Sequence, residues 1–528
     1  MTQRTSFFRK IIYGVLIMAL LFPIAWLSMP ATARTQGGKL AQIRSDPRHP
    51  FTQASLGEVD PASETIKLAT LGLRGIAVNA LWQKAKTYQM KEDWTSLTAT
   101  LEQLAKLQPN FISFWKFQAW NLTYNVSVEF DDFRDRYYYV RRGIQFLEEG
   151  ERYNADNPHL LWDLGWFVGQ KIGRADEHVQ YRRLYKNDDD VHPPDRLPDQ
   201  RDNWLVAKEW YLKGIDAVDN KGRSLDKKPP RIFYSSPAMS QLNYAEAIEE
   251  EGHFDKARRA WIEAEKEWED FGQVVIEHST GVPLRLGDEP RLTAEVARLQ
   301  AELDALAPGL REQLKAQKRA ALTDDERAAL DTPADRRTTK QMELVYSASP
   351  KLEVTDRELA ERIAKDQPEK EKQALKTTVE LEQARQVLRY TQQYKNDANY
   401  DYWLMRAQLE QTDNALAARE AMFLAARAFR EGDLLKAREL YEKGFAKWRL
   451  VFDQFPQYIE SESSTADDLI TYILQYRDVL DQLDERLGDD FPLWDVVERF
   501  DNEQKLADEL QAHKQRTGQA PAETAETP

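Results

Sequence analysis

Pairs of helical segments with small residues at fixed offsets recur in this chain, and this recurrence restricts the fold more than any other feature. One copy is centred on Gly252 and a second on Gly432. The first copy comprises Tyr244, Ala245, Ile248, Gly252, Phe254, Ala257, Trp261 and Ala264. The second comprises Leu424, Ala425, Ala428, Gly432, Leu434, Ala437, Tyr441 and Gly444. Small residues let two helices approach while large ones fill the remaining space, so each copy predicts a packed helix pair.

Two weaker copies lie nearer the N-terminus. One runs through Leu81, Ala85, Tyr88, Trp94, Leu97 and Leu101 to Pro109, and the other is indicated by Pro158 with Trp162. The spacing is that of the tetratricopeptide repeat, a helix pair of about 34 residues. Stacked pairs gain core with each repeat. We therefore expect an all-α fold, a right-handed superhelix of tetratricopeptide-like pairs interrupted by a charged helical arm.

The pattern along the chain predicts several parts. We expect an N-terminal repeat lobe at residues 66–285, a charged helical arm at 286–390, a C-terminal repeat lobe at 391–507 and a disordered tail at 508–528. Residues 231–234 are expected in an extended loop and residues 331–353 in irregular structure. In the arm, a heptad-like stripe predicts an intramolecular helix pair rather than a dimer. The stripe consists of Leu292, Val296, Leu299, Leu303 and Leu306.

The N-terminus predicts a membrane attachment. Arg4, Arg9 and Lys10 precede an apolar run over residues 11–29, which as a helix would span about 28 Å. Residues 1–33 are therefore expected to be a transmembrane signal anchor, or a signal peptide cleaved after Ala33, and residues 34–65 a tether. The basic flank would place the body outside the inner membrane, in the periplasm or an equivalent extracytoplasmic space.

Composition excludes several classes of function. The formal net charge of −15 argues against a nucleic-acid groove, which needs clustered Lys and Arg. The absence of cysteine excludes disulfides, thiolate metal sites and a cysteine nucleophile. The sequence also lacks the common phosphate-binding, dinucleotide-binding and serine-nucleophile motifs. We therefore predict no catalytic residue, no metal site and no cofactor.

Candidate partner-binding residues lie in two neighbouring segments. Asn121 and Asn125 share one predicted helix face and could clamp the backbone of a bound peptide, although a hydrogen bond between helices is the favoured alternative. Arg134, Arg141 and Arg142 alternate with a tyrosine run and could bind an acidic group. The favoured alternative is that the tyrosines face a core and the arginines face solvent.

Two acidic clusters give weaker hypotheses. Glu129, Asp131, Asp132 and Asp135 follow an aromatic helix that contains Trp115, Trp120 and Tyr124. Paired carboxylates beside aromatic rings are typical of proteins that cleave or bind glycans, but a helix start and a core are the favoured explanations. A second cluster, Asp188 to Asp190 with His192, could hold a cation, but it lacks the spacing of a calcium loop and is expected to be a surface loop.

Several stretches resemble a family of exported tetratricopeptide-like proteins from planctomycete-type bacteria. They lie at residues 71–75, 80–82, 107–111, 117–121, 124–127, 201–206, 399–403 and 410–413. The resemblance extends over about residues 66–460 and implies export and a repeat fold, without a particular activity. Some members carry a label that refers to iron-responsive elements and would imply RNA binding. The acidic charge and the export signal of this chain argue against that role.

Taken together, these features predict a non-enzymatic role. We expect a membrane-anchored helical-repeat scaffold or assembly factor that binds envelope proteins in a concave groove at the outer face of the inner membrane. The alternative is an envelope protein that binds or cleaves glycan. Exposed Trp with a carboxylate pair across a cleft would favour the alternative. A groove lined by Asn and Arg, with Trp buried between helices, would favour the scaffold.

Overall fold

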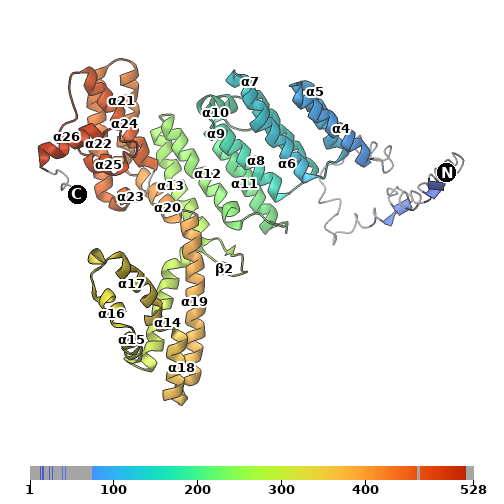
Figure 1. Ribbon diagram of the computed structural model, residues 1–528. Helices are drawn as coiled ribbons and strands as arrows, with labels where there is room; N and C mark the ends of the chain where they lie inside the picture. Colours follow the sequence, from blue (N-terminus) through green and yellow to red (C-terminus); the bar gives the residue numbers. More distant parts are fainter. Residues whose placement is uncertain are drawn as a thin grey trace, which may run out of the picture. The chain divides into compact units, whose positions relative to one another are not determined.

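A computed structural model describes residues 74–460 and 464–518, together with scattered single positions between 12 and 42. The fold is all-α, as predicted (Figure 1). The β-structure of the described ranges is a short antiparallel sheet of β1 (Ile276–Glu277) and β2 (Pro283–Leu284), in which Ile276 lies opposite Leu284. No helix of the described part is long and apolar enough to cross a membrane. Apart from those single positions, the predicted anchor (1–33) and tether (34–65) lie outside the described residues.

The chain forms two compact units. Unit 1 combines Met1–Glu267 with Ala407–Pro528, and unit 2 is Trp268–Arg406. The first segment of unit 1 contains α4 (Arg74–Met90), α5 (Trp94–Leu107), α6 (Ile112–Trp120), η2 (Asn121–Val126), η3 (Ser127–Glu129), α7 (Phe133–Tyr153), α8 (Pro158–Trp166), η4 (Phe167–Lys171), α9 (Ile172–Arg174), α10 (His178–Lys186), η5 (Pro198–Gln200), α11 (Asn203–Asp219), α12 (Pro230–Glu250) and most of α13 (Phe254–Gln273). The second contains the end of α20 (Tyr400–Glu410), then α21 (Asp413–Arg430), α22 (Leu434–Gln454), α23 (Pro456–Glu460), α24 (Ser464–Gln482), α25 (Trp494–Phe500) and α26 (Ala507–Thr517).

Helix pairs occur where the sequence predicts them. Helices α12 and α13 flank Gly252, and α21 and α22 flank Gly432. Both glycines have a positive φ, of 84° and 80°, which glycine adopts without the steric cost of a Cβ. The weaker copy near Leu81 forms the pair α4 and α5. In Figure 1 the helices from α4 to α13 lie side by side in chain order.

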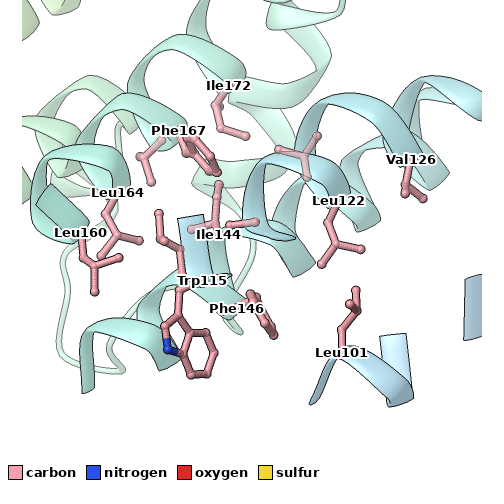
Figure 2. Packing of buried hydrophobic residues seen from close by; sticks show 14 of the residues in the cluster. Leu101, Trp115, Leu122, Val126, Ile144, Phe146, Leu160, Leu164, Phe167 and Ile172 are labelled. Carbon is pink, nitrogen blue, oxygen red and sulfur yellow. The ribbon is translucent and has the colours of Figure 1, made fainter. Parts of the chain in front are cut away.

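Close packing in the first part of unit 1 depends on glycines opposite large side chains. Trp115 of α6 is fully buried, and its ring lies against Gly150 of α7, where a Cβ would be 2.7 Å from the indole. Gly143 packs in the same way against Thr123 of η2. Figure 2 shows Trp115 near Phe146 within the apolar cluster that fills this region. Gly143 and Gly150 therefore set how closely α7 approaches α6 and η2.

Unit 2 is inserted between two helix pairs of unit 1. Within unit 1, the Phe254 ring of α13 contacts the Phe423 ring of α21, with centroids 5.8 Å apart. Gln411 Nε2 donates a hydrogen bond of 2.5 Å to Glu265, so the two ends of the insertion lie close together. The sequence predicted separate repeat lobes at 66–285 and 391–507. Their described residues outside unit 2 belong instead to one compact unit.

Unit 2 has a core of its own. Its remaining elements are η6 (Leu286–Asp288), α14 (Glu289–Leu306), α15 (Leu310–Ala320), α16 (Asp324–Asp331), η7 (Ala334–Arg336), α17 (Thr339–Leu352), α18 (Asp356–Asp366), η8 (Pro368–Lys370) and α19 (Glu371–Asp397). Leu299 and Leu303 of α14 are buried in one cluster with Leu381 of α19. The predicted intramolecular pairing of the heptad-like stripe is therefore confirmed.

Three segments differ from the sequence-based expectation. Residues 231–234 begin α12 rather than an extended loop, because Pro230 occupies the first helical turn and Phe233 is buried. Residues 339–352 form α17 within the stretch expected to be irregular, and its start is closed by a capping box of Thr338 with Gln341. Helix α26 occupies much of the predicted disordered tail.

The ordering of α26 has a local cause. His513 stacks on Trp494 with ring centroids 4.4 Å apart, and its Nδ1 lies 3.1 Å from Asp489. The composition of the tail predicts disorder, but this aromatic contact and the ion pairs of Lys514 with Glu498 and of Arg516 with Asp489 hold the helix in place. Residues 519–528 lie outside the described residues.

Candidate functional site

An open groove lined by aromatic rings runs across α4, α6 and α8. It consists of two hollows of about 400 and 570 Å³ that share Ser113 and Phe117. The smaller hollow is chiefly apolar and is lined by residues including Val78, Trp82, Leu104, Phe111, Phe114 and Phe117. The larger one is lined by residues including Lys116, Phe117, Trp120, Trp162, Asp163 and Trp166. We call the two hollows together the aromatic groove.

The rings of this groove are unusually exposed. The exposed fractions are 40% for Trp82, 56% for Phe117, 45% for Trp120 and 37% for Trp166. These residues come from the first helices of consecutive pairs, whereas Trp115, on the opposite face of α6, is fully buried. Contiguous exposed apolar surface of this kind is typical of binding sites. The groove is therefore the strongest candidate site in the described part of the chain.

The orientation of Trp162 is fixed by its neighbours. Its ring stacks on Trp166 with centroids 5.4 Å apart and planes inclined by 18°. The indole N–H donates a hydrogen bond of 2.9 Å to the hydroxyl of Ser236 on α12. The ammonium of Lys228 lies 3.2 Å from the ring centroid, within the range of a cation–π contact. Three elements thus hold the ring rigidly at the wall of the groove.

Charged residues surround this end of the groove, and Lys116 and Asp163 belong to its lining. Asp163 accepts ion pairs from two lysines, at 2.9 Å from Lys116 and 3.7 Å from Lys228. Burial lowers the pKa of Lys228 to about 8. The positive charge of Lys116 also lowers this pKa, whereas the negative charge of Asp163 raises it. Burial also lowers the pKa of His159, which lies 3.6 Å from Asp226.

A π-helical turn follows the groove tryptophan in two of these helices. Trp120 ends α6 and is followed by η2, and Trp166 ends α8 and is followed by η4. Asn203 is buried and donates from its amide to the carbonyls of Val168 and Gly169, each at 3.2 Å. Such turns are frequently found at functional sites. Here they lie directly beside the exposed rings.

The predicted asparagines lie in η2, outside the lining of the groove. Asn121 is buried, and its Oδ1 accepts hydrogen bonds from Asn125 at 3.0 Å and from Gln89 of α4 at 3.5 Å. Asn125 itself is exposed. The side chain of Asn121 therefore connects two helices, as the alternative to peptide binding predicted.

The predicted arginines are held by ion pairs within the chain. Arg141 contacts Asp188 at 3.2 Å and Asp190 at 3.0 Å, and Arg142 contacts Glu102 of α5 at 2.6 Å. Arg134 is exposed beside Asp132, at 3.6 Å. The three arginines therefore do not form one free basic patch. Burial, with the charge of Asp188, raises the pKa of Tyr137 far above its usual range.

Members of both acidic clusters make contacts within the chain. Asp132 caps α7 by accepting from the N–H of Arg134 at 2.7 Å, which is the structural role that its position predicted. Among the described residues that line the groove, Asp163 is the one carboxylate. No group of three His, Asp or Glu side chains in the described ranges is placed to hold a metal ion. His192 is buried, and its Nε2 lies 2.8 Å from the carbonyl of Tyr185.

Of the residues that line the groove, Trp120 stands out in the sequence as a candidate, whereas Trp82, Phe117, Trp166 and Lys116 do not. A usable signal was present, because Phe117 and Trp120 are three residues apart and lie on the opposite face of their helix from the buried Trp115. Comparison with models of protein families found none that matches the chain, and comparison with curated proteins found no match. The function of the groove must therefore follow from its own geometry and charge.

Proposed function

We propose that this chain is a tetratricopeptide-like scaffold that binds a segment of a partner protein in the aromatic groove. An N-terminal helix would hold it at the outer face of the inner membrane, as expected for the exported family that it resembles. The observation that carries the proposal is the continuous row of exposed rings on α4, α6 and α8. First helices of stacked pairs commonly provide the binding surface of repeat proteins.

The dimensions and chemistry of the groove support a protein ligand. The apolar hollow of about 400 Å³ could accept a bulky side chain as an anchor. Its long, open form across three helices fits an extended or helical segment better than a compact small molecule, which usually occupies a more enclosed site. Aromatic residues also contribute large contact areas with little loss of side-chain entropy.

Glycan binding is the second candidate. The exposed Trp120 and the Trp162–Trp166 stack could pack against sugar rings. Glycan cleavage has less support, because Asp163 lines the groove without a second carboxylate among the described lining residues and is held by Lys116. The second candidate is therefore glycan binding without cleavage.

Site-specific photocrosslinking in intact cells tests the proposal. A photoreactive phenylalanine analogue would replace Phe117 in the groove, and a matched control would carry it at Leu212 on α11, which is also exposed. We expect the same envelope protein to be crosslinked at Phe117 repeatedly and not at Leu212. Loss of this product in a Trp82→Ala variant would assign it to the groove. Crosslinks to peptidoglycan alone at Phe117 would reject the scaffold and favour glycan binding.

A further inference from the structure

We infer that the partner segment carries an acidic side chain next to an apolar anchor, and that its carboxylate pairs with Lys116 in the lining of the aromatic groove, close to the second ammonium group of Lys228. This inference rests on the proposed function and specifies the chemistry of the ligand. A partner protein presenting an aspartate or glutamate beside a large apolar residue is the occupant that the groove fits.

The first argument is an imbalance of charge beside Trp162. Two ammonium groups share the single carboxylate of Asp163, at 2.9 and 3.7 Å. Asp226 is exposed. One of its carboxylate oxygens lies 3.6 Å from Nε2 of His159, and the other accepts a hydrogen bond from the hydroxyl of Ser224. The formal net charge of the whole chain is −15, so a locally positive site is unusual for this protein. A carboxylate from a ligand would complete the pairing.

The second argument is desolvation. The Lys228 side chain is only 12% exposed, and one side of its ammonium faces the Trp162 ring. Burial and the charge of Lys116 lower the pKa of Lys228 to about 8, and the charge of Asp163 opposes this shift. A second carboxylate would favour the charged form of this lysine. Charge-assisted hydrogen bonds in such partly buried places are stronger than those at an open surface.

The third argument is the position of the apolar hollow. It adjoins the charged hollow through Ser113 and Phe117, so a segment lying along the groove would meet both. An anchor near Trp82 and Phe114 would supply apolar contact area, and the acidic residue would fix direction and register. Only a segment that occupies both hollows would place an apolar anchor and an acidic residue in their respective contacts.

A peptide selection tests the inference with the full-length chain in detergent micelles. A random peptide library displayed on phage is selected against the chain, and enriched peptides are resynthesised with each acidic residue in its native form or replaced by its amide. We expect enriched peptides to combine an aromatic or aliphatic anchor with Asp or Glu. The amide versions should bind about ten-fold more weakly, the loss expected for one charge-assisted pair.

Variants of the protein provide the reciprocal measurement. A Lys116→Met, Lys228→Met double variant keeps the aliphatic stems but removes both charges. It should reduce the difference between acidic and amide peptides to less than two-fold, whereas Lys266→Met, at an exposed position on α13, should leave it unchanged. The comparison of the two peptide forms on the unaltered protein remains decisive if the double variant does not fold.

Two negative outcomes have separate meanings. Enriched peptides that bind in the groove with apolar anchors but bind equally well as acids and amides would overturn the acidic ligand and leave the proposed function intact. Failure to enrich any peptide over a Trp82→Ala, Phe117→Ala variant would overturn both. Enrichment of basic peptides would contradict the assigned polarity of the site.

Discussion

Arg182 and Asp202 form an ion pair that is almost completely removed from solvent. Nη2 of Arg182 lies 2.8 Å from Oδ2 of Asp202, and the two side chains are only 4% and 3% exposed. Asp202 also caps α11 by accepting from the N–H of Trp204 at 2.9 Å. Glu251, at the end of α12, accepts from the same guanidinium at 2.9 Å. One arginine thus links α10 to the ends of two other helices.

Removal of this guanidinium is expected to destabilise unit 1 strongly. Arg182→Met leaves the buried carboxylate of Asp202 with Lys186, at 3.1 Å, as its remaining cationic partner. Breaking a buried ion pair costs up to about 3–5 kcal/mol. Arg183→Met, at the neighbouring exposed position, is the matched control. Hydrogen exchange at the amides of α10 and α11 should accelerate in Arg182→Met but not in Arg183→Met. Equal exchange in both variants would contradict a stabilising role for the pair.

The close contact of Gly150 with Trp115 makes a second prediction. Gly150→Ala places a methyl group 2.7 Å from the indole, which requires the helices to separate, and we expect a loss of about 1–3 kcal/mol. Gly75, the second residue of α4, has no other part of the chain within 4 Å of an added Cβ, so Gly75→Ala should stabilise the chain slightly, by less than the value of about 1 kcal/mol for a helix interior. Urea unfolding followed by circular dichroism should give opposite signs for the two variants.

The pKa of Glu148 predicts how stability depends on pH. Burial, opposed by Arg152 and Lys213, raises this pKa to about 7 from the ordinary value of 4.5. The folded state therefore holds this proton more tightly than the unfolded state. Its contribution to stability is present below pH 4.5 and is lost as the pH rises towards 7. Glu148→Gln should be more stable than the unaltered chain at pH 8 and similar to it at pH 4.

Unfolding by urea at a series of pH values checks this expectation. The difference in unfolding free energy between the variant and the unaltered chain should grow between pH 4.5 and 7 and then level off. Glu129→Gln, at an exposed position near the start of α7, is the control and should change the profile little. A Glu148→Gln profile parallel to that of the unaltered chain would show that Glu148 does not contribute.

The insertion of unit 2 predicts that it can be removed. Glu265 and Gln411 are hydrogen-bonded, so a short flexible linker could join Glu267 to Ala407. We expect the shortened chain to remain folded, because Phe254 and Phe423 still pack against each other. Circular dichroism and peptide binding in the groove would measure this. Loss of binding and of helicity together would contradict the independence of the two units.

The helix pairs around Gly252 and Gly432 could be predicted from the sequence because their small residues and turn glycines directly reflect close helix packing. The packing of residues from the two predicted lobes into one compact unit could not be predicted in this way. It depends on contacts such as Phe254 with Phe423, which are far apart in the sequence and carry no periodic signal. Helix α26 was missed for a similar reason, since its composition is polar and its contacts, such as the stacking of His513 on Trp494, involve residues outside the helix.

The aromatic groove adjoins the segment in which the sequence predicted partner-binding residues, but those residues do not line it. Asn121, Arg141 and Arg142 have the chemistry of a peptide-binding surface, yet their partners Gln89, Asp188 and Glu102 lie 32 or more residues away and satisfy them within the chain. Sequence alone does not show such pairing. The exposed rings were discounted because Trp at helical spacing usually faces a core, which holds for Trp115 but not for Trp120.

The π-helical turns η2 and η4 set the direction in which the groove tryptophans point around their helix axes. Each turn accommodates one residue more than an α-helix of the same rise. Deleting that residue would rotate the preceding part of the helix by about 100° relative to the part that follows. Trp120 and Trp166 stand at the point where the rotation begins. Two single-residue expansions of the backbone thus decide which way these rings face.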